Sequence, residues 1–237
     1  MSTFILVHGA WHGAWCWHKI VPRLERLGHT VIAPDLPSLG RDKTPVNRVS
    51  LPLWRDFICR IVDAQTEPVI LVGHSRGGIV ISEVAEQRPD RIRSLVYLTA
   101  FLLRDGECLF DLAQQDPVSL VPPNMVMSDD KSCSTMKEAS IRETFYGECS
   151  DDDVALARSL LQLEPTLPLA TPLKLTADNF GRVPRVYIEC LRDRALPPGL
   201  QKQMYTALPC RKIVSIDTDH SPFFSRPDEL TAHLHSL

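Results

Sequence analysis

The stretch Glu67–Val80 (EPVILVGHSRGGIV) decides the fold of this 237-residue chain. Its apolar run Val69–Val72 predicts a strand buried on both faces, and a helical pattern follows the motif Gly-His-Ser-Arg-Gly. In this strand–turn–helix context, G-x-S-x-G is typical of a nucleophile elbow. The turn is so tight that Cβ atoms would crowd Ser75, and Gly73 and Gly77 remove two of them. The pattern predicts that Ser75 is a nucleophile at the carboxyl end of its strand; the alternative is an unreactive serine in a glycine-rich turn.

The composition is that of a globular protein, with 44% hydrophobic and 23% charged residues. The net charge of −3 gives no reason to expect a nucleic-acid or membrane-surface partner. No apolar run approaches the roughly 18 residues of a membrane span. The N-terminal residues lead directly into an apolar strand without the features of a signal peptide. The seven cysteines form no C-x-x-C pairs, which argues against zinc or a disulfide framework. We therefore expect a cytoplasmic protein.

Strand and helix patterns alternate along the chain. One-sided apolar patterns predict helices over residues 20–27, after Ser50, after the elbow, over 198–207 and after Ser225, which is the expected N-cap of the last helix. Such alternation predicts a parallel, doubly wound sheet with helices on both faces. The expected strands are residues 4–7, 29–33, 69–72, 94–98, 186–190 and 212–216.

The middle of the chain has a different character. Between residues 104 and 178 the periodicity weakens, and prolines and acidic clusters divide the sequence into short segments, of which 137–146 and 152–163 are helical in pattern. The strand rhythm resumes afterwards. We interpret residues 104–178 as a helical cap inserted into a core formed by residues 1–103 and 179–237.

Chemistry-bearing residues follow several of the expected strands. His8, Ser75, Asp193 and His220 each lie just past a strand end, where ligands bind in parallel sheets. A serine needs a base to accept its proton and a third group to orient that base. The chain order Ser75, Asp193, His220 is the order of the α/β-hydrolases. We predict His220 as the base and Asp193 as the acid, and assign Asp219 to shaping the loop because it is too close in sequence to His220.

An ester-cleaving serine also needs two N–H donors for the developing oxyanion. The predicted donors are the backbone N–H groups of Arg76, which follows the nucleophile, and Ala10, which follows the first strand. The side chain of Arg76 has two interpretations: an ion pair with a cap carboxylate, or contact with a polar or anionic part of the substrate. No residue pattern suggests a metal or a cofactor.

The first strand and its loop carry a more specific signal. Residues 4–19 (FILVHGAWHGAWCWHK), 33–36 (APDL) and 219–224 (DHSPFF) resemble the plant methyl esterase and hydroxynitrile lyase branch of the α/β-hydrolases, which shares an H-G-A/T-x-H-G-A-W-x-W pattern. Bacterial carboxylesterases similar to this branch also exist. The resemblance implies an α/β-hydrolase fold, cofactor-free chemistry, a mobile apolar cap and possibly a homodimer.

Two positions distinguish esterase from lyase within the branch. The lyases carry Thr at the position of Gly9 and Lys at the position of Ser221, and both lyase groups are missing here. We therefore predict a serine carboxylesterase acting on small to medium, largely apolar esters through an acyl-enzyme. The alternatives are a hydroxynitrile lyase and a ligand-binding receptor on a hydrolase scaffold. The expected substrate-contacting residues are Gly9, Trp17, Phe101 and Phe145.

Overall fold

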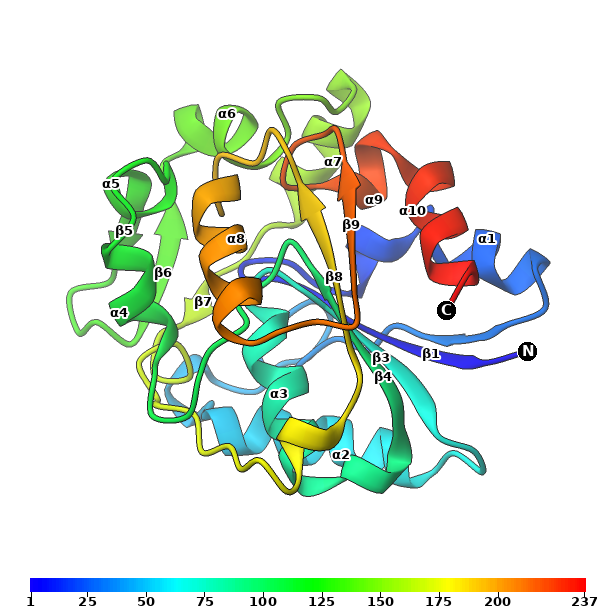
Figure 1. Ribbon diagram of the computed structural model, residues 1–237. Helices are drawn as coiled ribbons and strands as arrows, with labels where there is room; N and C mark the ends of the chain where they lie inside the picture. Colours follow the sequence, from blue (N-terminus) through cyan, green and yellow to red (C-terminus); the bar gives the residue numbers. More distant parts are fainter.

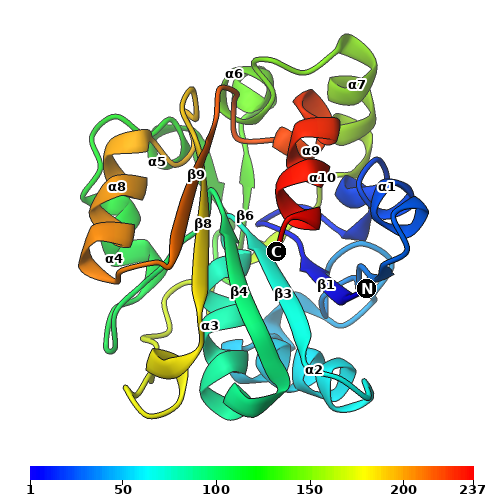
Figure 2. The same ribbon diagram turned by 45° about the vertical axis from the view of Figure 1, so that its right-hand side comes forward.

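A six-stranded sheet forms the centre of the molecule in the computed structural model, which describes residues 1–237 (Figures 1 and 2). The strands are all parallel and lie in the order β2-β1-β3-β4-β8-β9. The predicted α/β-hydrolase sheet is therefore confirmed. Its strands are β1 (Thr3–Val7), β2 (Thr30–Ile32), β3 (Val69–His74), β4 (Ile92–Leu98), β8 (Arg185–Cys190) and β9 (Lys212–Ile216).

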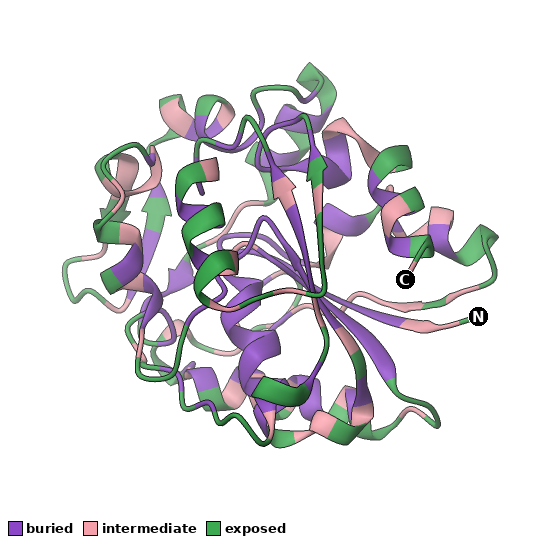
Figure 3. Ribbon diagram, viewed as in Figure 1, coloured by how far each residue is buried: buried purple, intermediate pink, exposed green.

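The central strands are the apolar ones because helices cover them on both faces. Every residue of β3 is buried, whereas the edge strands β2 and β9 are largely intermediate or exposed (Figure 3). A strand buried on both sides cannot alternate apolar and polar residues, and the Val69–Val72 run meets this demand. The strand that carries the elbow is thus held rigidly in the middle of the sheet.

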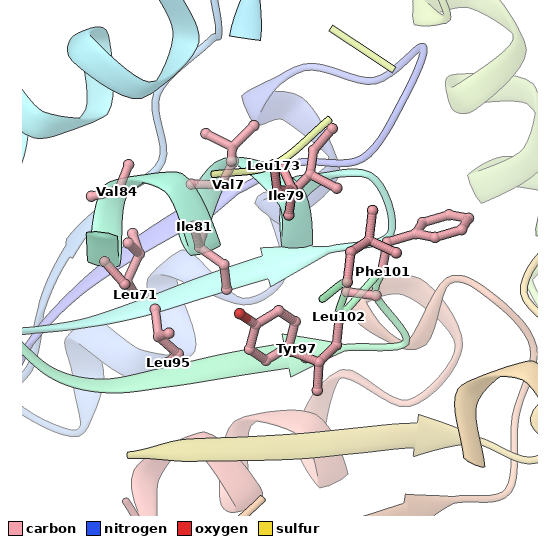
Figure 4. Close-up of a cluster of buried hydrophobic side chains, with 14 of the residues drawn as sticks. Val7, Leu71, Ile79, Ile81, Val84, Leu95, Tyr97, Phe101, Leu102 and Leu173 are labelled. Atoms are coloured by element: carbon pink, nitrogen blue, oxygen red, sulfur yellow. The ribbon is translucent and has the colours of Figure 1, made fainter. Parts of the chain in front are cut away.

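Three helices cover one face of the sheet: α2 (Leu51–Asp63), α3 (Gly77–Gln87) and α8 (Pro198–Ala207). Ser50 is the N-cap of α2, where its Oγ accepts a hydrogen bond from the Leu53 N–H. The α3 helix is buried nearly throughout, and Figure 4 shows its side chains packed over β3 and β4. Within this packing, Tyr97 Oη and Ser82 Oγ share a hydrogen bond of 2.7 Å.

Helices α1 (Val21–Arg26), α9 (Pro222–Ser225) and α10 (Pro227–His235) contribute to the core on the opposite face. The prediction that Ser225 caps the last helix was wrong. That helix begins at Pro227, with Arg226 as N-cap, because a proline at the first position favours a helix start there. Ser225 ends α9 instead, and its Oγ bonds Asp219 and Thr218 in the preceding loop.

The chain between β4 and β8 is not purely helical. It contains a small antiparallel sheet, β5-β6-β7, that the sequence did not suggest. These strands are only two to four residues long, too short for an alternating pattern, and β7 joins β6 from about 30 residues away. The elements of this segment are α4 (Leu109–Gln114), α5 (Val121–Asn124), β5 (Met125–Met127), β6 (Cys133–Met136), α6 (Ile141–Phe145), α7 (Asp151–Leu160) and β7 (Glu164–Pro165).

Short 3₁₀ turns complete the chain, at η1 (Ala14–Trp17), η2 (Val46–Arg48), η3 (Pro89–Arg91), η4 (Glu138–Ser140) and η5 (Phe180–Arg182). The helix predicted over 137–146 is thus η4 followed by α6. None of the helices is both long and apolar enough to cross a lipid bilayer. The cap boundaries at residues 104 and 178 stay predictions.

Candidate active site

Ser75 occupies the turn between β3 and α3 in a left-handed backbone conformation, with φ of +53°. This conformation is unfavourable for a residue with a side chain and persists only where the surroundings enforce it. The end of β4 does so: the Ser75 N–H donates to the Leu98 carbonyl at 3.3 Å, and the Ser75 carbonyl accepts from Phe101 N at 3.0 Å. The strained serine is therefore fixed to the neighbouring strand.

The glycines of the motif are required by close packing. A Cβ on Gly73 would lie 2.8 Å from the carbonyl of Gly77, and a Cβ on Gly77 would lie 2.7 Å from the carbonyl oxygen of Val7. Side-chain atoms essentially never approach backbone this closely. The two glycines let α3 start directly against the ends of β1 and β3.

His220 and Asp193 follow β9 and β8 and meet at the same edge of the sheet. The imidazole Nδ1 lies 2.6 Å from Asp193 Oδ2, and both side chains are buried. The other carboxylate oxygen, Oδ1, accepts from the N–H groups of Ala195 at 2.7 Å and Leu196 at 2.8 Å. Each oxygen of Asp193 thus has its own set of donors, which fixes the orientation of the carboxylate.

Thr99 is a third partner of Asp193 that the sequence did not reveal. Its hydroxyl Oγ1 donates to Asp193 Oδ2, the oxygen that faces His220. Thr99 is fully buried just past β4 and has a positive φ of +37°. Its place after a strand end, beside the predicted substrate residue Phe101, is a signal that could have singled it out.

The loop of His220 is tied to the elbow by the histidine that precedes the serine. His74 Nε2 donates to the carbonyl oxygen of His220 at 2.9 Å, and the two ring centroids lie 4.6 Å apart. No hydrogen bond joins Ser75 Oγ to His220 in this structure. Such contacts often tighten only when a substrate binds.

A largely apolar cavity of about 70 Å³ adjoins Ser75. Ala10 and Arg76 also line it, and neither of their backbone N–H groups has a hydrogen-bond partner in the protein. Both residues are buried. Unpaired N–H groups of buried residues are uncommon in folded proteins and call for an explanation. Thirteen of the eighteen lining residues are hydrophobic, and they include Phe101 and Phe145 but not Gly9 or Trp17.

Trp17 and Gly9 are not among the residues that line the cavity. Trp17 is fully buried, with its ring centroid 5.4 Å from that of Phe223 and 6.3 Å from that of His74. A Cβ on Gly9 would lie 2.7 Å from His74 Nδ1, so this position is filled by the histidine. Both residues therefore lie against His74 of the elbow, and their contact with the substrate stays a prediction.

The Arg76 side chain is buried and forms an ion pair with Glu164 of β7, with Nε 2.8 Å from Oε1. Burial lowers the pKa of Arg76 and raises the pKa of Glu164, and the attraction between the two charges opposes both shifts. The sequence left two interpretations of this side chain open: an ion pair with a cap carboxylate, or contact with the substrate. The structure shows the ion pair, with a carboxylate of the 104–178 segment.

Asp219, next to His220 in sequence, bonds its own loop. Its Oδ1 accepts from Ser221 N at 3.0 Å, and its Oδ2 accepts from Glu148 N at 2.7 Å. This arrangement agrees with the loop-shaping role expected for it. No group of three or more His, Cys, Asp or Glu side chains is arranged to hold a metal ion.

Three further histidines around the site are buried and neutral. Burial lowers the pKa of His8 and of His12 to about 3 and lowers that of His74 as well. His12 uses both ring nitrogens: Nδ1–H donates to the Ala10 carbonyl at 2.6 Å, and Nε2 accepts from Tyr146 Oη at 2.6 Å. A protonated ring could not accept the second bond.

These histidines predict acid instability. Because their folded-state pKa values lie below the unfolded value of about 6.5, the unfolded chain binds more protons, and stability falls as the pH drops below that value. Three such groups give a slope of about 4 kcal/mol per pH unit well below pH 6.5. Urea unfolding at several pH values between 7 and 5 measures this slope of the unfolding free energy against pH. His12→Gln, which keeps a donor and an acceptor but cannot be protonated there, should lower the slope to about 2.7 kcal/mol per pH unit. Equal slopes in the two proteins would contradict the assignment.

Comparison with known proteins agrees with this architecture. The family model described as the alpha/beta hydrolase family matches residues 4–233, and the chain belongs to that family. Methylesterase 7 of Arabidopsis thaliana is 32% identical, with 98% of this chain and 95% of that protein covered. Putative methylesterase 11, chloroplastic, from the same plant is 33% identical over 97% of this chain, which spans 62% of that longer protein.

Solved structures lead to the same branch. A pyrethroid hydrolase from Sphingobium faniae superposes with a TM-score of 0.89 at 28% identity, covering 99% of this chain and 96% of that one. The predicted resemblance to the plant methylesterase-like branch is thereby confirmed.

Proposed function

We propose that this α/β-hydrolase is a serine carboxylesterase that cleaves small to medium, largely apolar esters. The observation that carries the proposal is the cavity at Ser75, which is lined by Ala10 and Arg76, two residues whose backbone N–H groups are unpaired. The buried His220–Asp193 pair lies at the same edge of the sheet. The relatives named methylesterases and the neighbouring pyrethroid hydrolase support ester cleavage.

In the proposed mechanism, Ser75 Oγ attacks the ester carbonyl carbon while His220 Nε2 takes the hydroxyl proton. Asp193 accepts the hydrogen bond from Nδ1–H, which holds the correct tautomer and stabilises the imidazolium without taking the proton. The N–H groups of Ala10 and Arg76 stabilise the oxyanion. His220 returns the proton to the departing alcohol. A water molecule activated by His220 then hydrolyses the acyl-enzyme.

The substrate class follows from the walls of the cavity. Residues 104–178 supply Leu109, Phe110, Val121 and Phe145, and the core supplies Phe101. This segment thus acts as a cap over the sheet edge, and an apolar acyl or alcohol group fills the space beneath it. The only polar side chains of the cavity besides Ser75 and Arg76 are Gln114 and Ser119.

Two of the earlier expectations, a homodimer and a cytoplasmic location, remain predictions.

One substrate panel tests the proposal. Nitrophenyl esters of rising chain length, methyl esters of aromatic acids, and mandelonitrile are offered to the wild type and to Ser75→Ala. Ester hydrolysis that Ser75→Ala abolishes supports the proposal. Release of cyanide from mandelonitrile without ester cleavage would replace it with lyase chemistry. Tight binding of a ligand without turnover would point to a receptor.

The oxyanion assignment predicts a contrast at Ala10. Ala10→Pro removes the N–H donor, and we expect kcat to fall by about 10²- to 10³-fold, the cost of losing one such donor. Ala10→Gly keeps the N–H and should have a mild effect. Initial rates on a nitrophenyl ester give kcat for both variants, and thermal unfolding checks that both are folded. Equal rates in the two variants would remove Ala10 from the oxyanion site.

A further inference from the structure

Arg76 carries a buried cation directly beside the proposed nucleophile, and its contacts are unusual. The guanidinium lies over the Trp54 ring, 4.3 Å from its centroid, and Nε donates to Glu164 Oε1 at 2.8 Å. Both charged side chains are buried, with exposed fractions of 1% for Arg76 and 0% for Glu164. Nη1 has no partner at all.

The remaining bonds of this pair reach the backbone on both sides of Ala10. Arg76 Nη2 donates to the carbonyl oxygen of Gly9 at 2.9 Å. Glu164 Oε2 accepts from the N–H of Trp11 at 2.9 Å. One proposed oxyanion donor, on Ala10, is therefore held from the residue before it and the residue after it. The other donor is the N–H of Arg76 itself.

Trp11 needs such support because its backbone is left-handed, with φ of +62°. A non-glycine residue keeps this conformation only when the surroundings enforce it. Besides the bond to Glu164, the Trp11 carbonyl accepts from Gln162 N at 2.9 Å, and its indole Nε1 donates to the Ser134 carbonyl at 3.2 Å. All three bonds come from β6, β7 or the chain just before β7.

We propose that the Arg76–Glu164 ion pair positions the two oxyanion donors, holding the Ala10 N–H at a fixed place relative to the Arg76 N–H. This inference rests on the proposed esterase function. The side chains of Arg76 and Glu164 have a positioning role, since they act through the backbone of residues 9–11, whereas the Arg76 N–H itself is one of the two proposed donors. The pair also makes the oxyanion site depend on β7, a strand of the 104–178 segment.

A role in general stability explains the pair less well. The free energy lost when two charges are removed from water offsets much of their mutual attraction. Apolar residues of similar size therefore often stabilise a protein as well as a buried ion pair, or better. What apolar residues could not supply is an acceptor for Trp11 N and the second donor for Gly9 O, which His8 Nδ1–H also contacts at 2.9 Å.

The test uses two conservative variants, Arg76→Lys and Glu164→Gln. Lysine keeps the charge but has no planar fork to reach Glu164 and Gly9 together. Glutamine keeps the size but leaves the cation without its counter-charge. Rates are expressed per active site, titrated with a phosphonate that labels Ser75. We expect kcat to fall about 10- to 100-fold, less than for outright loss of a donor, with KM changed by less than about threefold.

A second measurement separates positioning from folding. A trifluoromethyl ketone that forms an oxyanionic adduct with Ser75 should lose affinity by about the same factor as kcat, since both depend on the oxyanion donors. Its non-fluorinated counterpart, which forms no oxyanion, should bind as it does to the wild type. A merely structural role would lower the melting temperature and the titrated fraction but leave this affinity ratio unchanged.

Lys19→Met is the matched control. Lys19 Nζ lies 2.6 Å from Asp153 Oδ1, so this variant breaks another ion pair between the core and the 104–178 segment, away from Ala10. It should lower the melting temperature without changing kcat per titrated site.

Two results would decide against the inference itself. Wild-type rates and ketone affinity in both variants would overturn it while leaving the esterase proposal intact. So would loss of folding in both, which would show that the pair serves folding. A wild type that cleaves no ester, or a Ser75→Ala protein that still does, would instead overturn the proposed function on which the inference rests.

Discussion

Ser75→Ala is expected to reduce kcat for ester hydrolysis by about 10⁶-fold, the loss found when the serine of a hydrolase triad is removed. The alanine side chain cannot form an acyl-enzyme, so only the oxyanion donors and substrate binding would remain to assist attack by water. The backbone of residue 75 stays braced by Leu98 and Phe101, because those bonds involve main-chain atoms alone. The variant should therefore fold and still bind ligands in the cavity.

The matched control for this result is Ser119→Ala. Ser119 lines the same cavity, and its Oγ donates to the Ala195 carbonyl at 2.7 Å. Ser119 Oγ also accepts from Val121 N at 3.2 Å, and loss of these two hydrogen bonds should change the rate by less than about tenfold. Steady-state rates and phosphonate labelling measure both variants. A Ser75→Ala protein as active as Ser119→Ala would show that Ser75 is not the nucleophile.

Asp193→Asn is expected to lower kcat by about 10⁴-fold, as the comparable change does in serine proteases. Both carboxylate oxygens accept hydrogen bonds here: Oδ2 from His220, and Oδ1 from the N–H groups of Ala195 and Leu196. Asparagine has one acceptor and one donor end. If its oxygen faces the two N–H groups, its NH₂ faces His220 Nδ1 and favours the tautomer protonated at Nε2, which cannot take the serine proton.

Asp219→Asn is the matched control, since Asp219 is the neighbouring buried carboxylate. Its partners are Ser221 N, Glu148 N, Ser225 Oγ and Cys149 Sγ, none of which belongs to His220, so the change should destabilise the loop without altering the tautomer of His220. We expect a lower melting temperature and a loss in kcat below about 100-fold. A larger loss in Asp219→Asn than in Asp193→Asn would reassign the acid.

The parts of the structure that were predictable are those with local signals. The strands at the centre of the main sheet were visible because strands buried on both faces must be largely apolar. The α8 helix over Pro198–Ala207 and the Ser50 cap of α2 were predictable for similar reasons, from helical periodicity and from the chemistry of a serine at a helix start. The β5-β6-β7 sheet had no such signal, because its short strands pair across long stretches of chain.

The candidate active site likewise combines features that local sequence signals predict with features that depend on residues far apart in the chain. By itself, the sequence determined the turn around Ser75, because glycine on both sides is a local requirement, and it put His220 and Asp193 past strand ends that a parallel sheet brings to one edge. Only the tertiary structure decided that Thr99 bonds Asp193, that Trp17 packs against Phe223 without lining the cavity, and that Arg76 pairs with Glu164. The physical reason is that these contacts join residues far apart in the chain, and packing alone selects the partner of a buried polar group.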